Sequence, residues 1–488
     1  MNVIELRNFR FLFLLTLILV KTLNLTGNPI TLAEDGYKIK VQLTGITDTV
    51  CYLANYYGDK TYLTDTAFTD SKGRFTFEGD SALPGGVYII AGQSNNKFLE
   101  IIIDRSQHFS VTADIKTIMT DVKFEKSEEN VLFFDFIQYN MKIRKEIDNL
   151  RKRLKDEQLP ADSIANIKQR IDFLSKDIDA YQEKIILDNP ESFTSVMLKA
   201  MKEPEVKNVP ILPNGREDSV YRYQYYKAHF WDNYNLKDDR LLRTPLFHKR
   251  LDRYFKDIVY QNPDSIILAA DAFINKTKGN KEVFKYSVWY LTYKFETSKI
   301  MGFDEIFVHM VDAYYATGDA FWTDSTTLKA LVKNANALRP ILIDEIAPEL
   351  LLIDTVGKFV SLHHSPARYM VLLFYESDCG HCKSEIKELK EWTGTQDLGV
   401  HVFAVCTDTS LVKWRKFVKT NKLNWINVNA TRSITRDYHN LYNISMTPTI
   451  FLLDEKKKII AKRLKAEQLI PFLQNYHKYH SGESSPEN

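Results

Sequence analysis

The first part of the chain alternates between apolar and polar residues. From about residue 34 to residue 125, apolar positions recur every second residue, as they do from Gly36 to Leu43. Strict alternation of this kind predicts β-strands that are buried on one face only. The polar segment Asp70–Gly73 predicts a hairpin turn between two such strands. We therefore expect a β-sandwich-like domain over residues 34–125, with a small barrel as the alternative.

The pattern becomes helical after residue 126. Between residues 130 and 189, apolar residues recur at spacings of three and four, and Pro160 separates two such runs. This spacing predicts an antiparallel helical hairpin or a coiled-coil seam, with a homodimer interface as the alternative to packing within the chain. The helical pattern continues over residues 192–340, which are rich in Tyr, Trp and Phe. We expect an α-helical region over residues 126–340 whose aromatic side chains form a core.

Residues 341–480 combine short apolar runs with helical stretches. Tyr369–Tyr375 is an apolar run of strand length, and Lys383–Trp392 has a helical pattern. Strands that alternate with helices indicate an α/β domain. The predicted fold class is therefore a multidomain α+β protein, with a β-sandwich-like domain, a helical middle region and a C-terminal α/β domain.

The sequence Cys-Gly-His-Cys at residues 379–382 lies between that strand and that helix. Two cysteines at this spacing can form and break a disulfide, and a thiolate at a helix N-terminus is stabilised by the free amides and the helix dipole there. Half of a zinc site has the same spacing, but the chain has no second Cys-x-x-Cys sequence. We therefore expect a redox pair and no metal, and we expect buried thiols at Cys51 and Cys406.

A proline precedes a further apolar strand. Pro448 follows Thr447 and stands directly before the run Thr449–Leu453. Proline cannot donate a hydrogen bond to a strand ladder, so it belongs at the start of a strand. A Thr-Pro bond at this place is a candidate for a cis peptide bond, with an ordinary trans proline as the alternative.

These motifs resemble the TlpA/ResA-type thiol–disulfide oxidoreductases, within the thioredoxin-like and AhpC/TSA superfamily. The resemblance runs from about residue 347 to residue 479 and includes the strand Tyr369–Tyr375, the Cys-Gly-His-Cys sequence and Thr447-Pro448. It implies a C-terminal thioredoxin-like domain in which a cis-proline loop faces the redox pair. Thr447 and Pro448 would then hold the backbone of the substrate as an added short strand.

The resemblance also implies roles for the residues of the redox motif. Cys379 is expected to be the attacking thiolate, and Cys382 is expected to be the more buried resolving thiol. Gly380 and His381 separate them and are expected to tune the stability of the thiolate, because a partly positive imidazole favours the charged sulfur. The Cys379–Cys382 disulfide would itself carry the electrons, so no cofactor is implied.

Two positions differ from the family pattern. Asp378 precedes the first cysteine, where the family most often has Trp, and its carboxylate is expected to oppose the thiolate and counter His381. Leu373 occupies the place of the buried acid of thioredoxin, so proton transfer to Cys382 needs another group. Glu376 is the nearest acid and is our candidate for a proton relay. The sequence leaves open whether the pair is oxidising or reducing.

Charge and the N-terminal segment indicate where the protein works. The chain has 65 basic and 63 acidic residues and a net charge of +2, which argues against nucleic acid as a partner. Arg7 and Arg10 precede the apolar run Phe11–Val20, as in a secretory signal. We expect a signal peptide over residues 1–33, with an uncleaved anchor as the alternative, and a disordered tail over residues 481–488.

Together these features predict an exported thiol–disulfide oxidoreductase that is periplasmic or associated with the cell envelope. Its expected partners are protein thiols and disulfides and a membrane or periplasmic electron donor or acceptor. Its expected role is antioxidant and lies in redox homeostasis of the envelope. The alternative is an envelope binding or assembly protein in which the thioredoxin-like domain is regulatory or vestigial.

Overall fold

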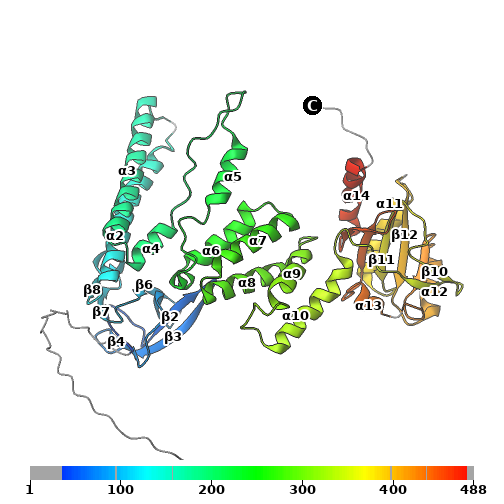
Figure 1. Ribbon diagram of the computed structural model, residues 1–488, viewed down its shortest axis with the longest axis horizontal. Coiled ribbons are helices and arrows are strands. Elements are labelled where there is room, and N and C mark those ends of the chain that lie inside the picture. The colour runs from blue at the N-terminus through cyan, green and yellow to red at the C-terminus, as the bar shows by residue number, and fades with distance from the viewer. Residues whose placement is uncertain (1–35, 94–95, 157, 396–397, 436, 481–488) are drawn as a thin grey trace, which may run out of the picture.

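The computed structural model describes residues 36–480, apart from 94–95, 157, 396–397 and 436. A β-domain, a helical region and a C-terminal α/β domain follow one another along the chain (Figure 1). The predicted fold class is therefore confirmed. The predicted signal peptide and C-terminal tail lie outside the described residues. Among the helices that are described, none is both long and apolar enough to cross a bilayer.

Two four-stranded sheets form the N-terminal domain. The elements are β1 (Tyr37–Thr44), β2 (Val50–Tyr57), β3 (Lys60–Phe68), β4 (Arg74–Gly79), β5 (Gly86–Gly92), β6 (Lys97–Ile103), β7 (His108–Asp114), α1 (Ile118–Asp121) and β8 (Lys123–Glu125). One sheet has the strand order β4-β1-β7-β8 and the other has the order β3-β2-β5-β6. On β1, Ile39, Val41 and Leu43 are buried and the residues between them are exposed. The inward side chains of both sheets form one core, as the two-residue repeat predicted for a sandwich.

Two long helices form the predicted antiparallel hairpin, which projects from the β-domain as an arm (Figure 1). They are α2 (Glu128–Arg153) and α3 (Ala161–Asp188). The Ser127 side chain caps the first turn of α2 by accepting a hydrogen bond from a backbone amide. The buried residues of the hairpin seam are Ile143, Ile147, Leu174 and Ile178.

The aromatic-rich segment folds into shorter helices. They are α4 (Phe193–Ala200), α5 (Ser219–His229), η1 (Asp239–Arg243), α6 (Leu246–Arg253), η2 (Tyr254–Ile258), α7 (Pro263–Thr277), α8 (Lys281–Glu296), α9 (Asp304–Met310), η3 (Val311–Tyr315), α10 (Ser325–Leu338) and η4 (Arg339–Ile341). Many of their aromatic side chains pack against one another in a common core, where Trp231 contacts Tyr254 and Phe273. Helix α5, however, buries none of its residues, and Tyr223 on it is exposed. The aromatic residues thus supply packing area, as expected from the sequence.

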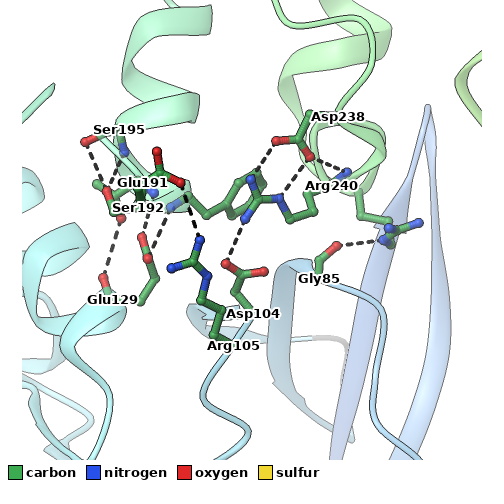
Figure 2. Close-up of polar contacts among 12 residues, drawn as sticks. Gly85, Asp104, Arg105, Glu129, Glu191, Ser192, Ser195, Asp238 and Arg240 are labelled. Carbon is green, nitrogen blue, oxygen red and sulfur yellow. Dashed lines mark hydrogen bonds and ion pairs between the residues drawn. The ribbon is translucent and has the colours of Figure 1, made fainter. Parts of the chain in front are cut away.

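Charged side chains join the β-domain to the helical region (Figure 2). Arg240 of η1 donates hydrogen bonds to Asp104, which follows β6, at 2.8 Å and to Asp238 at 2.6 Å. From the hairpin, the Glu129 carboxylate accepts hydrogen bonds from the first backbone amides of α4. Because α4 packs against α2 and α3, these contacts fix the arm, the β-domain and the shorter helices to one another.

A glycine allows a close approach at the same boundary. Gly58 lies in the turn between β2 and β3 with φ of +64°, and an added Cβ would lie 2.0 Å from the ring of Tyr286 on α8. The Tyr286 hydroxyl accepts a hydrogen bond from the Asp59 backbone amide at 3.1 Å. A side chain at position 58 would therefore separate the two parts of the chain.

The C-terminal domain is built on a seven-stranded sheet. Its elements are β9 (Leu351–Asp354), β10 (Phe359–Ser361), β11 (Tyr369–Tyr375), α11 (Gly380–Thr393), β12 (Val400–Cys406), α12 (Leu411–Thr420), β13 (Ile426–Asn429), α13 (Tyr438–Leu441), β14 (Thr449–Leu453), β15 (Ile459–Lys462) and α14 (Ala466–His480). The strand order is β10-β9-β13-β12-β11-β14-β15. Strands β11, β12 and β13 are parallel, whereas β14 is antiparallel to β11 and β15 is antiparallel to β14.

The central strand β11 is buried along its whole length and contributes to two cores. Val371 and Leu373 pack in a core with side chains of α11, α12 and α14. Met370 and Leu372 point to the opposite face of the sheet and belong to the core that continues into the helical region. The C-terminal domain therefore shares packed apolar surface with the helices that precede it.

A buried lysine joins the same two parts. Lys462, at the end of β15, has a side chain that is 4% exposed, and it pairs with Asp304 of α9. Its ammonium group also donates to the Ile341 carbonyl at 2.6 Å. Burial lowers the pKa of Lys462, and the neighbouring Asp304 carboxylate opposes that effect. The ammonium group therefore depends on Asp304 for its counter-charge.

We predict that Asp304→Ala destabilises the full-length protein by about 3–5 kcal/mol, because the substitution leaves the Lys462 charge buried without its partner. The free energy of unfolding can be measured by urea titration. Glu391→Ala is the matched control: it breaks an exposed ion pair with Lys387 and should cost less than about 1 kcal/mol. Equal losses in the two variants would contradict the role of the buried pair.

Candidate active site

The Cys-Gly-His-Cys sequence forms the junction between β11 and α11. Cys379 is the N-cap residue of α11, and its Sγ accepts a hydrogen bond from the Cys382 backbone amide at 3.3 Å. The helix begins at Gly380, three residues earlier than the sequence pattern suggested, so the motif itself forms the first helical turn. The Cys379 sulfur therefore lies at the positive end of a 14-residue helix, where a thiolate is stabilised.

The two thiols of the motif have different environments. Both cysteines are unpaired thiols, and Cys379 is half-buried whereas Cys382 is fully buried. Burial and the hydrogen bond with Cys379 raise the pKa of Cys382 to about 12. Cys379 is thus the accessible sulfur and Cys382 remains a protonated thiol at neutral pH. This asymmetry agrees with the roles expected from the sequence.

The Thr447-Pro448 segment faces the redox pair. The peptide bond between the two residues is cis, which is the isomer that the sequence suggested. The Thr447 carbonyl oxygen lies 3.8 Å from the Cys379 Sγ. A cavity of about 180 Å³ lies beside this loop. Its walls include Met446, Pro448, Ile450, Arg463 and Leu464. The cis-proline loop thus contacts the accessible sulfur and also lines a small cavity.

The two residues before Cys379 form polar contacts with residues of the neighbouring strand end and helix. Ser377 donates two hydrogen bonds to the Asp408 carboxylate, one from its backbone amide at 3.0 Å and one from its hydroxyl. Asp378 forms an ion pair with Lys413 of α12, with the charged atoms 2.5 Å apart. Burial raises the pKa of Asp408, but the hydrogen bonds from Ser377 outweigh burial and lower it. The approach to the first cysteine is therefore fixed by polar contacts.

Sequence reasoning did not identify Ser377, Asp408 or Lys413 as part of the site. A signal for Asp408 was available, because β11 and β12 are neighbouring parallel strands and polar residues just after such strands meet at one edge of the sheet. No comparable signal existed for Lys413, which is one of several charged residues on an exposed helix face.

The remaining candidate residues lie at the rim of the site. His381 is exposed in the first turn of α11, and a Cβ added to Gly380 would meet no atom within 4 Å. Glu376 is exposed, and its backbone carbonyl accepts a hydrogen bond from the Cys379 amide at 3.4 Å. No hydrogen bond among the described residues joins the Glu376 carboxylate to either thiol, so its part in proton transfer stays a hypothesis.

The other two cysteines are buried thiols in strands, as expected. Cys51 lies in β2 and Cys406 lies in β12. Burial raises the pKa of both thiols, and the Cys406 Sγ donates to the Asp408 carboxylate at 3.4 Å. In the part of the chain that the structure describes, no three His, Cys, Asp or Glu side chains gather closely enough to hold a metal ion.

We predict a large difference in alkylation between the two thiols of the motif. In Cys379→Ser, the remaining Cys382 should react with iodoacetamide at pH 8 at least about a hundredfold more slowly than Cys379 does in Cys382→Ser, because thiolate is the reactive form. Between pH 8 and pH 10 the Cys382 rate should rise about tenfold per pH unit. Peptide mass spectrometry separates these sites from Cys51 and Cys406. Similar rates for both thiols would contradict the assignment.

Three family models match the chain. Residues 343–462 match the AhpC/TSA family. Residues 180–335 match a domain of unknown function called DUF5106, and residues 37–133 match a second one called DUF4369. The redox motif thus lies inside the segment whose family is named.

The relatives of the chain carry matching names. It is 28% identical over 115 residues to the thiol-disulfide oxidoreductase ResA of Bacillus subtilis (strain 168). The aligned segment covers 23% of this chain and 63% of that protein. It is 26% identical over 136 residues to ResA of Bacillus thuringiensis subsp. konkukian, which covers 28% and 76% of the two chains. A solved domain of a possible thiol-disulfide isomerase from Cytophaga hutchinsonii is 36% identical, with 28% and 95% of the chains covered and a TM-score of 0.27. The C-terminal domain, of which residues 343–462 match the AhpC/TSA family, is a TlpA/ResA-like thiol–disulfide oxidoreductase domain.

Proposed function

We propose that the whole protein exchanges disulfides with protein partners through Cys379 and Cys382. The observation that carries this proposal is the position of the Cys379 sulfur, which caps α11 and faces the Thr447 carbonyl before cis-Pro448. A helix N-terminus favours the thiolate, and the Thr447 carbonyl, which accepts a hydrogen bond from the Cys379 thiol, can pair with an extended substrate segment once that thiol has lost its proton. The nucleophilic sulfur and the backbone that would bind the substrate therefore lie next to each other.

The exchange proceeds in two displacement steps. The Cys379 thiolate attacks one sulfur of a substrate disulfide, the substrate S–S bond breaks, and the departing substrate thiolate takes up a proton. Cys382 then loses its proton and attacks the Cys379 sulfur, which releases the second substrate thiolate and leaves the Cys379–Cys382 disulfide. Two electrons have moved from the protein to the substrate, and the reverse sequence oxidises a dithiol. Because burial raises the pKa of Cys382, its deprotonation is the step that most requires a general base.

The setting we propose is the cell envelope. An apolar segment with two preceding arginines supports export, and disulfide chemistry persists outside the cytoplasm. There the protein would contribute to redox homeostasis and antioxidant defence. A membrane or periplasmic donor or acceptor would return the Cys379–Cys382 pair to its starting state.

A trapping experiment tests the exchange mechanism directly. In full-length Cys382→Ser, Cys379 can attack a substrate but the mixed disulfide cannot be resolved. We expect covalent complexes with oxidised model substrates such as insulin, visible on non-reducing gels and released by dithiothreitol. Cys379→Ser is the matched control and should trap nothing. Equal trapping by both variants, or none by either, would contradict the assigned roles.

The second candidate function is binding or assembly in the envelope, with a regulatory or vestigial redox domain. One observation favours it: a cavity of about 580 Å³ is lined by residues of the β-domain and of the helical arm and by no residue of the C-terminal domain. Its lining includes Arg105, Lys126, Glu129 and Glu191. If a Cys379→Ser/Cys382→Ser variant captured envelope partners as well as the parent protein does, this second function would gain over the first.

A further inference from the structure

The segment that leads into Cys379 has a fixed conformation. Ser377 is buried, and both its amide and its hydroxyl donate to the Asp408 carboxylate beyond the end of β12. The Asp408 backbone carbonyl in turn accepts a hydrogen bond from the Asn429 side chain of β13 at 2.9 Å. Because three neighbouring strand ends are tied together in this way, the Asp378 side chain leaves the backbone from a defined position directly before the redox pair.

The partner of Asp378 is also held in place. Lys413 lies in the first turn of α12, which the Ser410 side chain caps, and it precedes the fully buried Trp414. The Trp414 indole donates to the Tyr375 hydroxyl of β11 at 3.2 Å. The hydrogen bond to Asp378 raises the pKa of Lys413, which therefore stays positively charged. The ion pair thus joins two anchored segments rather than two free side chains.

Both charged groups remain accessible to water. The Asp378 side chain is 75% exposed and the Lys413 side chain is 42% exposed, so the pair contributes little to the stability of the fold. Because the ion pair lies beside Cys379, it instead affects the stability of the Cys379 thiolate. An unpaired carboxylate next to a thiolate disfavours the charged sulfur, whereas a paired carboxylate does so much less.

We propose that Lys413 is a positioning residue of the redox pair: by holding and offsetting the Asp378 carboxylate, it preserves the Cys379 thiolate and makes the pair more oxidising. This inference rests on the proposed function. Other ionisable groups near the redox pair include His381 and Lys383 in the first turn of α11, Glu376 just after β11 and Asp408 behind Ser377. Of these, the Asp408 carboxylate accepts hydrogen bonds from Ser377, while His381 and Glu376 are exposed.

Three variants of the full-length protein test the proposal. Lys413→Met should slow the reaction of Cys379 with iodoacetamide at pH 7 by about two- to fivefold, the range expected from partly exposed charges. A less stable thiolate makes the reduced form less stable, so the reduction potential should fall by up to about 21 mV, which is a fivefold change converted for a two-electron couple and is approached where Cys379 is ionised. Asp378→Asn should shift both readouts in the opposite direction, and the double variant should return close to the parent protein.

Lys419→Met is the matched control. Lys419 is an exposed lysine on the same helix, six positions beyond Lys413, and its removal should leave both readouts unchanged. If Lys413→Met behaved like Lys419→Met, or if Asp378→Asn shifted the potential in the same direction as Lys413→Met, this inference would be overturned. The proposed function would stand in that case, provided that the parent protein shows a reversible couple. Absence of any couple in the parent protein would overturn both.

Discussion

The geometry of the candidate site depends on the start of one helix. Strand β11 is buried on both faces, and the chain turns sharply at its end so that Cys379 becomes the N-cap of α11. This turn places one sulfur at the helix N-terminus, half-exposed, and places Cys382 in the apolar core one turn further on. The electrostatic field of the helix and the desolvation of the core act in opposite directions on the two thiols. That difference underlies the roles we propose for Cys379 as the nucleophile and Cys382 as the resolving thiol.

The rest of the chain supports the site through continuous packing. One face of β11 belongs to a core that continues into the helical region, and Lys462 ties β15 to α9 across the same boundary. Strand β15 leads directly into residues 463–465, which line the cavity beside the cis-proline loop. The helices therefore brace one wall of the site without contributing a residue to the chemistry. The β-domain lies further away and is fixed to the helices by Arg240 and by the close approach at Gly58.

The sequence predicted those features that depend on local patterns. Alternation along β1, the helical repeat of the hairpin and the spacing of Cys379 and Cys382 each report on neighbouring residues, and all three correspond to what the structure contains. Contacts between distant segments were not predictable in this way. Asp378 and Lys413 are 35 positions apart, and the sequence analysis, which expected the Asp378 carboxylate to oppose the thiolate, could not identify its partner. The contact between Gly58 and Tyr286 could not be predicted from local sequence patterns either.

The most direct measurement of the central claim is a redox titration of the full-length protein. The fraction of Cys379–Cys382 disulfide would be followed during equilibration in glutathione and dithiothreitol buffers, with Cys379→Ser as the reference. The account predicts a single reversible two-electron couple that is lost in the reference. A potential near −270 mV would indicate a reductase, and one above about −180 mV would indicate an oxidant or isomerase. If the parent protein shows no reversible couple, disulfide exchange is not its function.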